Sequence, residues 1–265
     1  MYFRKIAIIG CGNIGMSLLQ GFLKEGSVSA EKITVTKRNT GELNSLIPTG
    51  INLTSDNIKA VNESELIIIA VKPYNIAEVL SEIKDHLQPG RHLLISITAG
   101  VTISQIQKSL SLQVPVFRVM PNISASVGKS VSCISHSKAA AEDIESVKQL
   151  FDITGTTMVI DEELMQSATI LGACGIAYVL RFIRAMIQGG IQIGFDAKTA
   201  SEIVTQTVKG AAELFIERKE HPEYEIDKVT TPKGCTIVGL NEMEHNGFSS
   251  SLIKGIVASY EKIEK

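Results

Sequence analysis

Hydrophobic positions in the first 160 residues follow two alternating patterns. Short continuous apolar runs at Ile6–Ile9 and 66–71 predict strands buried on both faces, and the first of them is too short and too rich in β-branched residues for a free helix. Residues 92–97 predict a further strand. Apolar residues at helical spacing come between them, as at 77–83 and Ile103–Leu110. The other elements predicted here are strands at 32–36, 51–53, 115–120, 131–135 and 158–160, and helices at 57–62 and 138–151. Strands that alternate with helices predict an α/β domain built on a doubly wound, mostly parallel sheet.

Beyond Asp161 the strand pattern stops, which predicts an all-α domain. Residues 162–188 predict one long helix or a broken pair, and residues 170–180 are apolar or small on every side. A helix that is apolar all round must be buried all round, and a domain of about 100 residues supplies too little surface for this. We therefore expect this helix to pack against a partner subunit. Asp196 is expected to cap the next helix. The predicted domains are residues 1–160 and 161–265.

A glycine motif lies between the first predicted strand and its helix. It reads Gly10-Cys11-Gly12-Asn13-Ile14-Gly15. In such a turn the first glycine allows a tight bend, the second lets backbone approach a pyrophosphate, and the third lets helix pack closely on strand. The helix N-terminus then presents N–H groups to the anion. The alternative is a plain structural turn. We predict a Rossmann-type dinucleotide site that uses Gly10, Gly12, Asn13, Ile14 and Gly15.

The residues after the second strand bear on the choice of coenzyme. About 20 residues beyond the glycines, where NAD-binding folds carry an acidic residue for the ribose 2′-hydroxyl, the chain has Lys37 and Arg38 with flanking hydroxyls. Basic side chains suit a 2′-phosphate, so we expect NADP(H) to be preferred, with NAD(H) possible. The alternative is a solvated basic loop. Lys72 and Pro73, which end another buried strand, and Gly100 are expected at the same ligand-binding edge.

Composition narrows the possible partners. The chain of 265 residues is 44% hydrophobic, with 26 Lys and Arg against 28 Asp and Glu, so nucleic acid and anionic membranes are not expected partners. The start lacks a signal peptide pattern, and the uncharged stretch 167–180 is shorter than the roughly 20 residues of a membrane-spanning helix. The four cysteines and five histidines are scattered. We expect a cytoplasmic protein with reduced thiols and no metal site.

A second anion site is predicted near the C-terminus. Thr231 before Pro232 predicts an N-cap followed by proline at the first helical position. The N–H groups of Gly234, Cys235 and Thr236 would then bind a carboxylate, and Thr236 adds a hydroxyl. The alternative is an ordinary helix start.

Six motifs, in their order and spacing, resemble those of the pyrroline-5-carboxylate reductase family. They are Ile8-Ile9-Gly10-Cys11-Gly12-Asn13-Ile14-Gly15, Ala70-Val71-Lys72-Pro73, Ser96-Ile97-Thr98-Ala99-Gly100-Val101, Arg118-Val119-Met120-Pro121-Asn122, Gln206-Thr207-Val208-Lys209-Gly210-Ala211, and Thr230-Thr231-Pro232-Lys233-Gly234-Cys235-Thr236. The resemblance covers nearly the full length. It implies a Rossmann domain, a helical domain that interlocks in a homodimer and often joins a larger ring, and hydride transfer from NAD(P)H to 1-pyrroline-5-carboxylate. The product is L-proline, so this is the last step of proline biosynthesis.

The resemblance also implies roles for individual residues. Thr236 matches the threonine that hydrogen-bonds the ring nitrogen and is the expected catalytic residue, and Lys233, Gly234 and Cys235 match the substrate loop. Ala70, Val71, Lys72, Pro73 and Gly100 match the nicotinamide pocket, and Asn57 matches an asparagine near the cofactor.

The chain departs from the family pattern at several positions. A serine of the family is Cys174, a proline is Ile176, and Pro-Asn-Thr-Pro-Ala becomes Pro121-Asn122-Ile123-Ser124-Ala125. A substrate-loop glycine is Lys233, which would be strained if that position needs positive φ, and a neighbouring small residue is Cys235.

Three other functions stay open. A β-hydroxyacid dehydrogenase shares the two-domain plan but needs a lysine on the first long helix of the second domain, and residues 161–195 contain none. A catalytically weak, dinucleotide-binding paralogue is compatible with Ile176, Ser124 and Lys233. A reductase of a related cyclic imine acid is the third.

Overall fold

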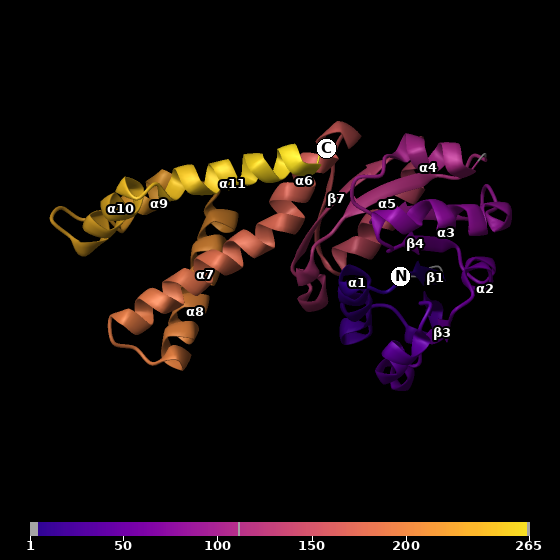
Figure 1. Cartoon of the computed structure of the whole chain (residues 1–265), viewed down its shortest axis with the longest axis horizontal. Helices are drawn as coiled ribbons and strands as arrows, with labels where there is room; N and C mark the ends of the chain where they lie inside the picture. Colours follow the sequence, from indigo (N-terminus) through magenta and orange to yellow (C-terminus); the bar gives the residue numbers. More distant parts are fainter. Residues whose placement is uncertain (1–4, 111, 264–265) are drawn as a thin grey trace. The chain divides into compact units, whose positions relative to one another are not determined.

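The computed structural model describes residues 5–110 and 112–263 and divides into two units, which are described separately. The first unit reaches to Cys174, and the second covers Gly175–Lys262 (Figure 1).

The first unit contains an eight-stranded sheet in the order β3-β2-β1-β4-β5-β6-β7-β8. Its neighbouring strands are parallel except β6 and β7, which are antiparallel. The strands are β1 Ile6–Ile9, β2 Ile33–Thr36, β3 Asn52–Thr54, β4 Leu66–Ile69, β5 Leu93–Ser96, β6 Val116–Met120, β7 Ser130–His136 and β8 Gly155–Val159. The predicted mostly parallel sheet is confirmed.

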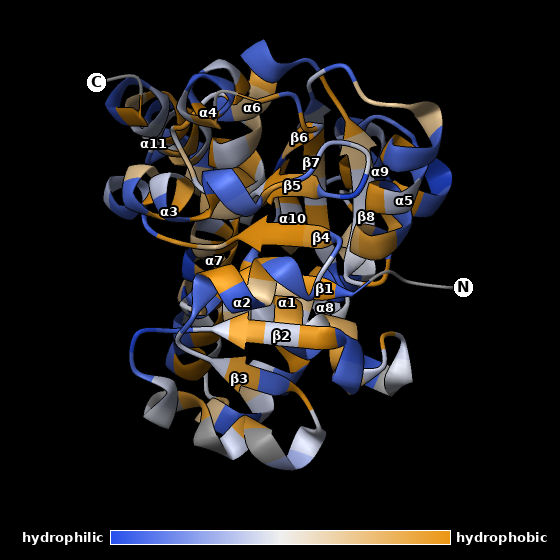
Figure 2. Ribbon diagram, turned by 90° about the vertical axis from the view of Figure 1, so that its right-hand side faces the viewer, coloured by the Kyte–Doolittle hydropathy of each residue, from blue (hydrophilic) through white to orange (hydrophobic). Residues whose placement is uncertain are grey.

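Both faces of the central strands are buried, as their unbroken apolar runs predict. In β1, Ile6 and Ile8 belong to one core cluster and Ala7 and Ile9 to another, because successive side chains of a strand point to opposite faces. Residues of α1 (Asn13–Leu23) and α5 (Ala141–Asp152) join the first cluster, and residues of α2 (Asn57–Asn62), α3 (Ile76–Ile83) and α4 (Ile103–Leu110) join the second. Figure 2 shows the strands largely in hydrophobic colours. Helices on both faces make the sheet doubly wound.

The helices of this unit mostly lie where helical spacing places them. They are α1 Asn13–Leu23, α2 Asn57–Asn62, α3 Ile76–Ile83, α4 Ile103–Leu110, α5 Ala141–Asp152 and α6 Met165–Ala168. Several element ends differ from the prediction. β4 ends at Ile69 rather than at residue 71, β8 begins at Gly155 rather than at 158, and α5 begins at Ala141 rather than at 138. Apolar patterning marks burial, whereas an element ends where its backbone hydrogen bonding changes, so the two can differ by a few residues.

The structural division falls later than the predicted boundary between residues 160 and 161. Met165 is fully buried and packs in a small cluster with Met120 and Cys133 of the sheet. The chain continues as a π-helix at Thr169–Cys174 before α7 starts at Gly175. Residues 162–188 therefore form a helix that is interrupted by the π-helix, not one regular long helix. The segment before the interruption packs on the sheet through Met165.

The second unit consists of helices within the part of the chain that is described. They are α7 Gly175–Gln192, α8 Ala197–Arg218, α9 Pro222–Lys228, α10 Cys235–His245 and α11 Phe248–Ile263. Asp196 caps α8 as predicted, because its Oδ1 accepts from the N–H groups of Lys198 at 3.0 Å and Thr199 at 3.1 Å. Hydrogen bonds from Thr199 hold the pKa of the Asp196 carboxyl below its usual range.

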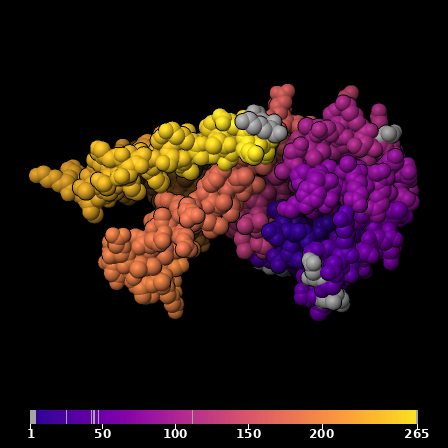
Figure 3. Space-filling model, in the orientation of Figure 1, coloured from indigo at the N-terminus to yellow at the C-terminus, as the bar shows by residue number. Residues whose placement is uncertain are grey.

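Much of the apolar surface of this unit is exposed. Tyr178 on α7 donates to the Ser259 hydroxyl on α11 at 2.7 Å. Away from this contact, the orange helices α7 and α8 diverge from the yellow α11, and side chains on both sides face solvent (Figure 3). Leu180 is 55% exposed and Phe215 50%. The stretch Glu162–Gln192 is also long and apolar enough, by length and composition alone, to cross a membrane. The stretch 170–180, which the sequence predicts to be buried on all sides, is therefore partly exposed in a single chain.

Candidate functional site

The glycine loop after β1 is shaped by close contacts. Gly10 has φ +84°, and its N–H donates to the Thr36 carbonyl at 3.1 Å. A Cβ on Gly10 would lie 2.6 Å from Val71 Cγ1, and one on Gly15 would lie 2.9 Å from the Gly10 carbonyl oxygen. Apart from Gly12 and its two chain neighbours, no described residue has an atom within 4 Å of a Cβ placed on Gly12. Gly10 and Gly15 therefore allow the loop, the residues after β4 and the start of α1 to pack closely, and Gly12 borders open space.

The start of α1 is suited to an anion. Gly12 is its N-cap, with extended backbone and no side-chain cap hydrogen bond. The N–H groups of Asn13, Ile14 and Gly15 therefore lack helical partners and can donate to a phosphate. Cys11 is buried, and this burial raises the pKa of its thiol, while Lys37 lowers it by a smaller amount. The loop thus carries no thiolate charge at neutral pH, and its open cradle at Gly12 fits a dinucleotide pyrophosphate.

Replacing Gly12 with alanine is expected to weaken NADPH binding at least about tenfold, because the added methyl would occupy the space in which backbone approaches the pyrophosphate. The free energy of unfolding should change by less than about 1 kcal/mol, since φ is −82° and the methyl meets no described atom. Titration of NADPH fluorescence and urea unfolding would measure both. Gly10→Ala is the contrasting variant and should lose stability. Unchanged NADPH affinity in Gly12→Ala would contradict the predicted phosphate site.

The carboxyl ends of β1, β4 and β5 lie together beside this loop. Ala70 donates its N–H to the Ile9 carbonyl at 2.8 Å, and the Thr98 hydroxyl donates to the Val71 carbonyl at 3.2 Å. Lys72 and Pro73 follow as exposed residues. Gly100, also at this edge, has φ +75°. The structure therefore places Ala70 and Val71, which follow β4, against the glycine loop, and Thr98 joins the segment after β5 to Val71.

A second group of polar residues lies at the end of β2. The Thr36 hydroxyl donates to Asn57 Oδ1 at 2.6 Å, and Asn57 Nδ2 donates to Glu82 on α3 at 2.7 Å. Arg38 forms an ion pair with Glu78, also on α3, at 2.8 Å. Residues 37–41, which follow β2 in the sequence, include no acidic residue, but α3 supplies two, Glu78 and Glu82, at the end of this strand.

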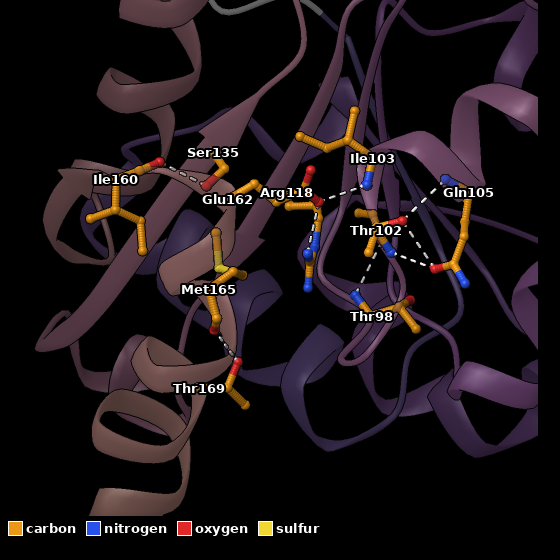
Figure 4. Close-up of polar contacts among 11 residues, drawn as sticks. Thr98, Thr102, Ile103, Gln105, Arg118, Ser135, Ile160, Glu162, Met165 and Thr169 are labelled. Atoms are coloured by element: carbon orange, nitrogen blue, oxygen red, sulfur yellow. Dashed lines mark hydrogen bonds and ion pairs between the residues drawn. The ribbon is translucent and has the colours of Figure 1, made fainter. Parts of the chain in front are cut away.

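A buried ion pair supports the turn that follows β5. Arg118 on β6, with a side chain only 5% exposed, donates through Nη1 to Glu162 Oε1 at 2.8 Å. The same oxygen accepts the N–H of Ile103, the first residue of α4, at 2.7 Å. Figure 4 shows Glu162 between these two groups. One carboxylate thus joins β6 to the start of α4, just after the Gly100 turn.

The predicted substrate loop lies in the second unit, and its helix begins later than predicted. α10 starts at Cys235 with Gly234 as its N-cap, so the prediction of Thr231 as N-cap and Pro232 at the first helical position is wrong. Residues 231–234 form a turn, in which the Gly234 N–H donates to the Thr231 carbonyl at 2.9 Å. Gly234 therefore cannot offer that N–H to an anion. The donors at the helix start are Cys235, Thr236 and Ile237.

Lys233 is strained in this turn. Its φ is +62°, and Lys219 at the C-cap of α8, with φ +55°, shares this conformation. A left-handed backbone is unfavourable for any residue with a Cβ, and glycine is the usual occupant. The strain anticipated from the family's glycine is therefore present.

Lys233→Gly is expected to raise the free energy of unfolding by about 0.5–1 kcal/mol, because relief of strain exceeds the extra chain entropy of glycine. The KM for an anionic substrate should rise if the lysine charge attracts its carboxylate. Lys219→Gly is the matched control, which should stabilise similarly and leave KM unchanged. Urea unfolding and steady-state kinetics would measure the two effects, and no stabilisation in either variant would contradict the strain.

Ser124, one of the departures from the family pattern, belongs to a local hydrogen-bond network. Asn122 is buried, and its Oδ1 accepts from the Ser124 N–H at 3.0 Å and hydroxyl at 2.6 Å. Its Nδ2 donates to the Gly172 carbonyl of the π-helix at 3.0 Å. Ser124 therefore helps to hold the asparagine that joins β6 to the π-helix. Cys174 ends that π-helix and Ile176 lies in the first turn of α7.

Sequence reasoning did not identify Glu78, Glu82 or Glu162 as site residues. Each acts on a residue 25 to 59 positions away, so no local pattern pointed to it. Among residues 5–110 and 112–263, no group of three or more His, Cys, Asp or Glu side chains could hold a metal ion.

Comparison with known proteins gives consistent matches to both parts of the chain. A family model described as pyrroline-5-carboxylate reductase dimerisation matches residues 162–265, and one described as NADP oxidoreductase coenzyme F420-dependent matches residues 5–100. Pyrroline-5-carboxylate reductase 2 of Dictyostelium discoideum is 40% identical over 278 residues, which cover 99% of this chain and 93% of that protein.

Two further relatives extend this similarity. Pyrroline-5-carboxylate reductase 1 of Dictyostelium discoideum is 42% identical over 274 residues and 99% of this chain, but this chain spans only 50% of that protein's length. The crystal structure of Plasmodium falciparum pyrroline carboxylate reductase with NADP bound matches with a TM-score of 0.89 and 29% identity, over 99% of this chain and 98% of that one.

Proposed function

This chain belongs to the pyrroline-5-carboxylate reductase family, and we propose that it reduces 1-pyrroline-5-carboxylate to L-proline with NAD(P)H. The observation that carries the proposal is the pairing, in one chain, of an open glycine cradle at Gly12 with a helix start at Cys235 that presents Thr236. The first suits a pyrophosphate, and the second suits a small carboxylate beside a hydroxyl.

In the proposed reaction, bound NAD(P)H supplies the hydride for the C=N bond. The N–H groups of Cys235, Thr236 and Ile237 hold the substrate carboxylate, and the positive end of the helix dipole adds to this attraction. The Thr236 hydroxyl orients the ring nitrogen. A protonated imine already carries its proton, so these residues act through positioning and need no strong acid or base. Lys233 is proposed to add positive charge near the carboxylate.

The proposed coenzyme site uses the residues named from the sequence. Gly10, Gly12, Asn13, Ile14 and Gly15 would form the pyrophosphate cradle. Lys37, Arg38 and Asn57 would face the adenosine ribose, and Ala70, Val71, Lys72, Pro73 and Gly100 would line the nicotinamide side. Basic residues after β2 favour NADPH over NADH.

We also propose a homodimer formed by the helical unit. A dimerisation model matches residues 162–265, and exposed apolar side chains such as Leu180 and Phe215 need a covering surface. A second copy would cover the exposed apolar side chains of α7, whereas insertion of Glu162–Gln192 into lipid would have to bury charged residues such as Arg181 and Arg184. Sedimentation would measure the mass, including any larger ring. A dimer is compatible with the expected cytoplasmic location, which stays a prediction.

The test is oxidation of NADPH and of NADH by the purified protein, followed at the nicotinamide absorbance band, with and without pyrroline-5-carboxylate. Thr236→Ala is expected to lower kcat/KM at least about tenfold, because a hydrogen bond to a charged group is lost, and to leave NADPH affinity unchanged. Thr236→Ser keeps the hydroxyl and is the matched control.

No oxidation in the presence of retained NADPH binding would overturn the proposal. A homologous cyclic imine acid should then be tried. Turnover of that compound would identify a related imine reductase, and no turnover of either would favour the catalytically weak paralogue.

A further inference from the structure

We propose that Glu78 weakens the preference for NADPH by competing with the ribose 2′-phosphate for Arg38. The inference rests on the proposed binding of NAD(P)H at the end of β2. It concerns how tightly the 2′-phosphate is held and is independent of the substrate that is reduced.

The contact between the two residues is direct. Arg38 Nη2 lies 2.8 Å from Glu78 Oε2, so one nitrogen of the guanidinium that would serve the 2′-phosphate already contacts a carboxylate. The side chains are 78% and 68% exposed. Ion pairs that stay in water are weak, and a phosphate dianion carries more charge and more acceptor oxygens than a carboxylate. A phosphate can therefore displace Glu78, although part of its binding energy is lost in doing so.

The position of Glu78 is set by the fold. The chain of hydrogen bonds from Thr36 through Asn57 to Glu82 joins the end of β2 to α2 and then to α3. Glu78 and Glu82 lie four residues apart on α3, so they share one face of that helix. Both acidic groups thus lie at the edge where Lys37 and Arg38 are expected to meet the coenzyme, and their charge opposes a phosphate.

Two consequences separate this proposal from a purely structural ion pair. Neutralising Glu78 should strengthen binding only of ligands that carry the 2′-phosphate, and the gain should need Arg38. A role limited to stabilising α3 would change the affinity for all nucleotides together, or for none.

The experiment is calorimetric titration of the full chain with 2′,5′-ADP and with 5′-AMP, two probes that differ by the 2′-phosphate. The wild type is compared with Glu78→Gln, Arg38→Gln and the double variant, at low and at high salt. Glu145→Gln is the control, because Glu145 forms an exposed ion pair with Lys148 on α5. NADPH and NADH titrations then extend the comparison to whole coenzymes.

In Glu78→Gln, the affinity for 2′,5′-ADP should rise about 2- to 5-fold and that for 5′-AMP should stay unchanged. The gain should shrink at high salt, because salt screens exposed charges, and should vanish in the double variant. Glu145→Gln should behave as wild type.

Equal affinities for 2′,5′-ADP in Glu78→Gln and wild type would overturn the proposal. So would a gain that persists without Arg38, or an equal gain for 5′-AMP. The titrations contain no imine substrate, so their result does not depend on which imine the protein reduces. A failure of this proposal can therefore be told apart from a failure of the proposed reductase activity.

Discussion

Replacing Glu162 with alanine is expected to lower the free energy of unfolding by about 3 kcal/mol. The change leaves the buried Arg118 guanidinium without its carboxylate, and removing one partner of a buried ion pair typically costs about 3–5 kcal/mol. We expect the lower end because the Glu162 side chain is 32% exposed and water can partly replace it. The Ile103 N–H also loses its acceptor.

Urea unfolding at a fixed protein concentration would measure this loss, since the stability of an oligomer depends on concentration. The exposed neighbour Glu163 provides the control variant Glu163→Ala, which should lose less than about 0.5 kcal/mol. The double variant Arg118→Met with Glu162→Ala should be more stable than Glu162→Ala alone, because no unpaired charge stays buried. A Glu162→Ala protein as stable as Glu163→Ala would contradict this account.

Gly21→Ala is expected to destabilise the protein by about 2–3 kcal/mol, although alanine is the better helix former by about 1 kcal/mol. A Cβ on Gly21 would lie 2.4 Å from the Ala125 carbonyl oxygen and 2.9 Å from Thr154 Cγ2. Ala125 belongs to the 3-10 turn Ile123–Val127, and a backbone oxygen cannot rotate away as a side chain can. Helix α1 would therefore have to shift.

Because the start of α1 forms the predicted phosphate site, NADPH affinity should fall together with stability. Gln20→Ala, on an exposed position of the same helix, is the control and should change neither. Thermal unfolding and NADPH titration of the two variants would measure these effects. A Gly21→Ala protein of unchanged or increased stability would show that helix propensity outweighs the crowding.

The glycines in α1 and in the loop before it illustrate which features of the site are visible in the sequence. Gly10, Gly12 and Gly15 have a fixed spacing after an apolar strand, so their roles could be predicted from local pattern alone. Gly21 has no such pattern, because its neighbour Ala125 is about 100 residues away. Glu78 and Glu162 could not be predicted for the same reason. Glu78 meets its partner only because α3 packs on the sheet, and Glu162 meets its partner only because the chain returns to the sheet after β8.

The sequence by itself determined the α/β class, the order of strands and helices in the first unit, the glycine turn and the cap at Asp196. These features depend on the pattern of buried positions and on contacts between residues a few positions apart. Both can be read from the sequence. The tertiary structure decided the late start of α10, the strained backbone of Lys233, and the carboxylates around Arg38 and Arg118. The two carboxylates come from other elements and lie beside their arginines only after the chain has packed. The start of α10 and the backbone of Lys233 depend on the angles of a local turn, which the residue types alone do not fix.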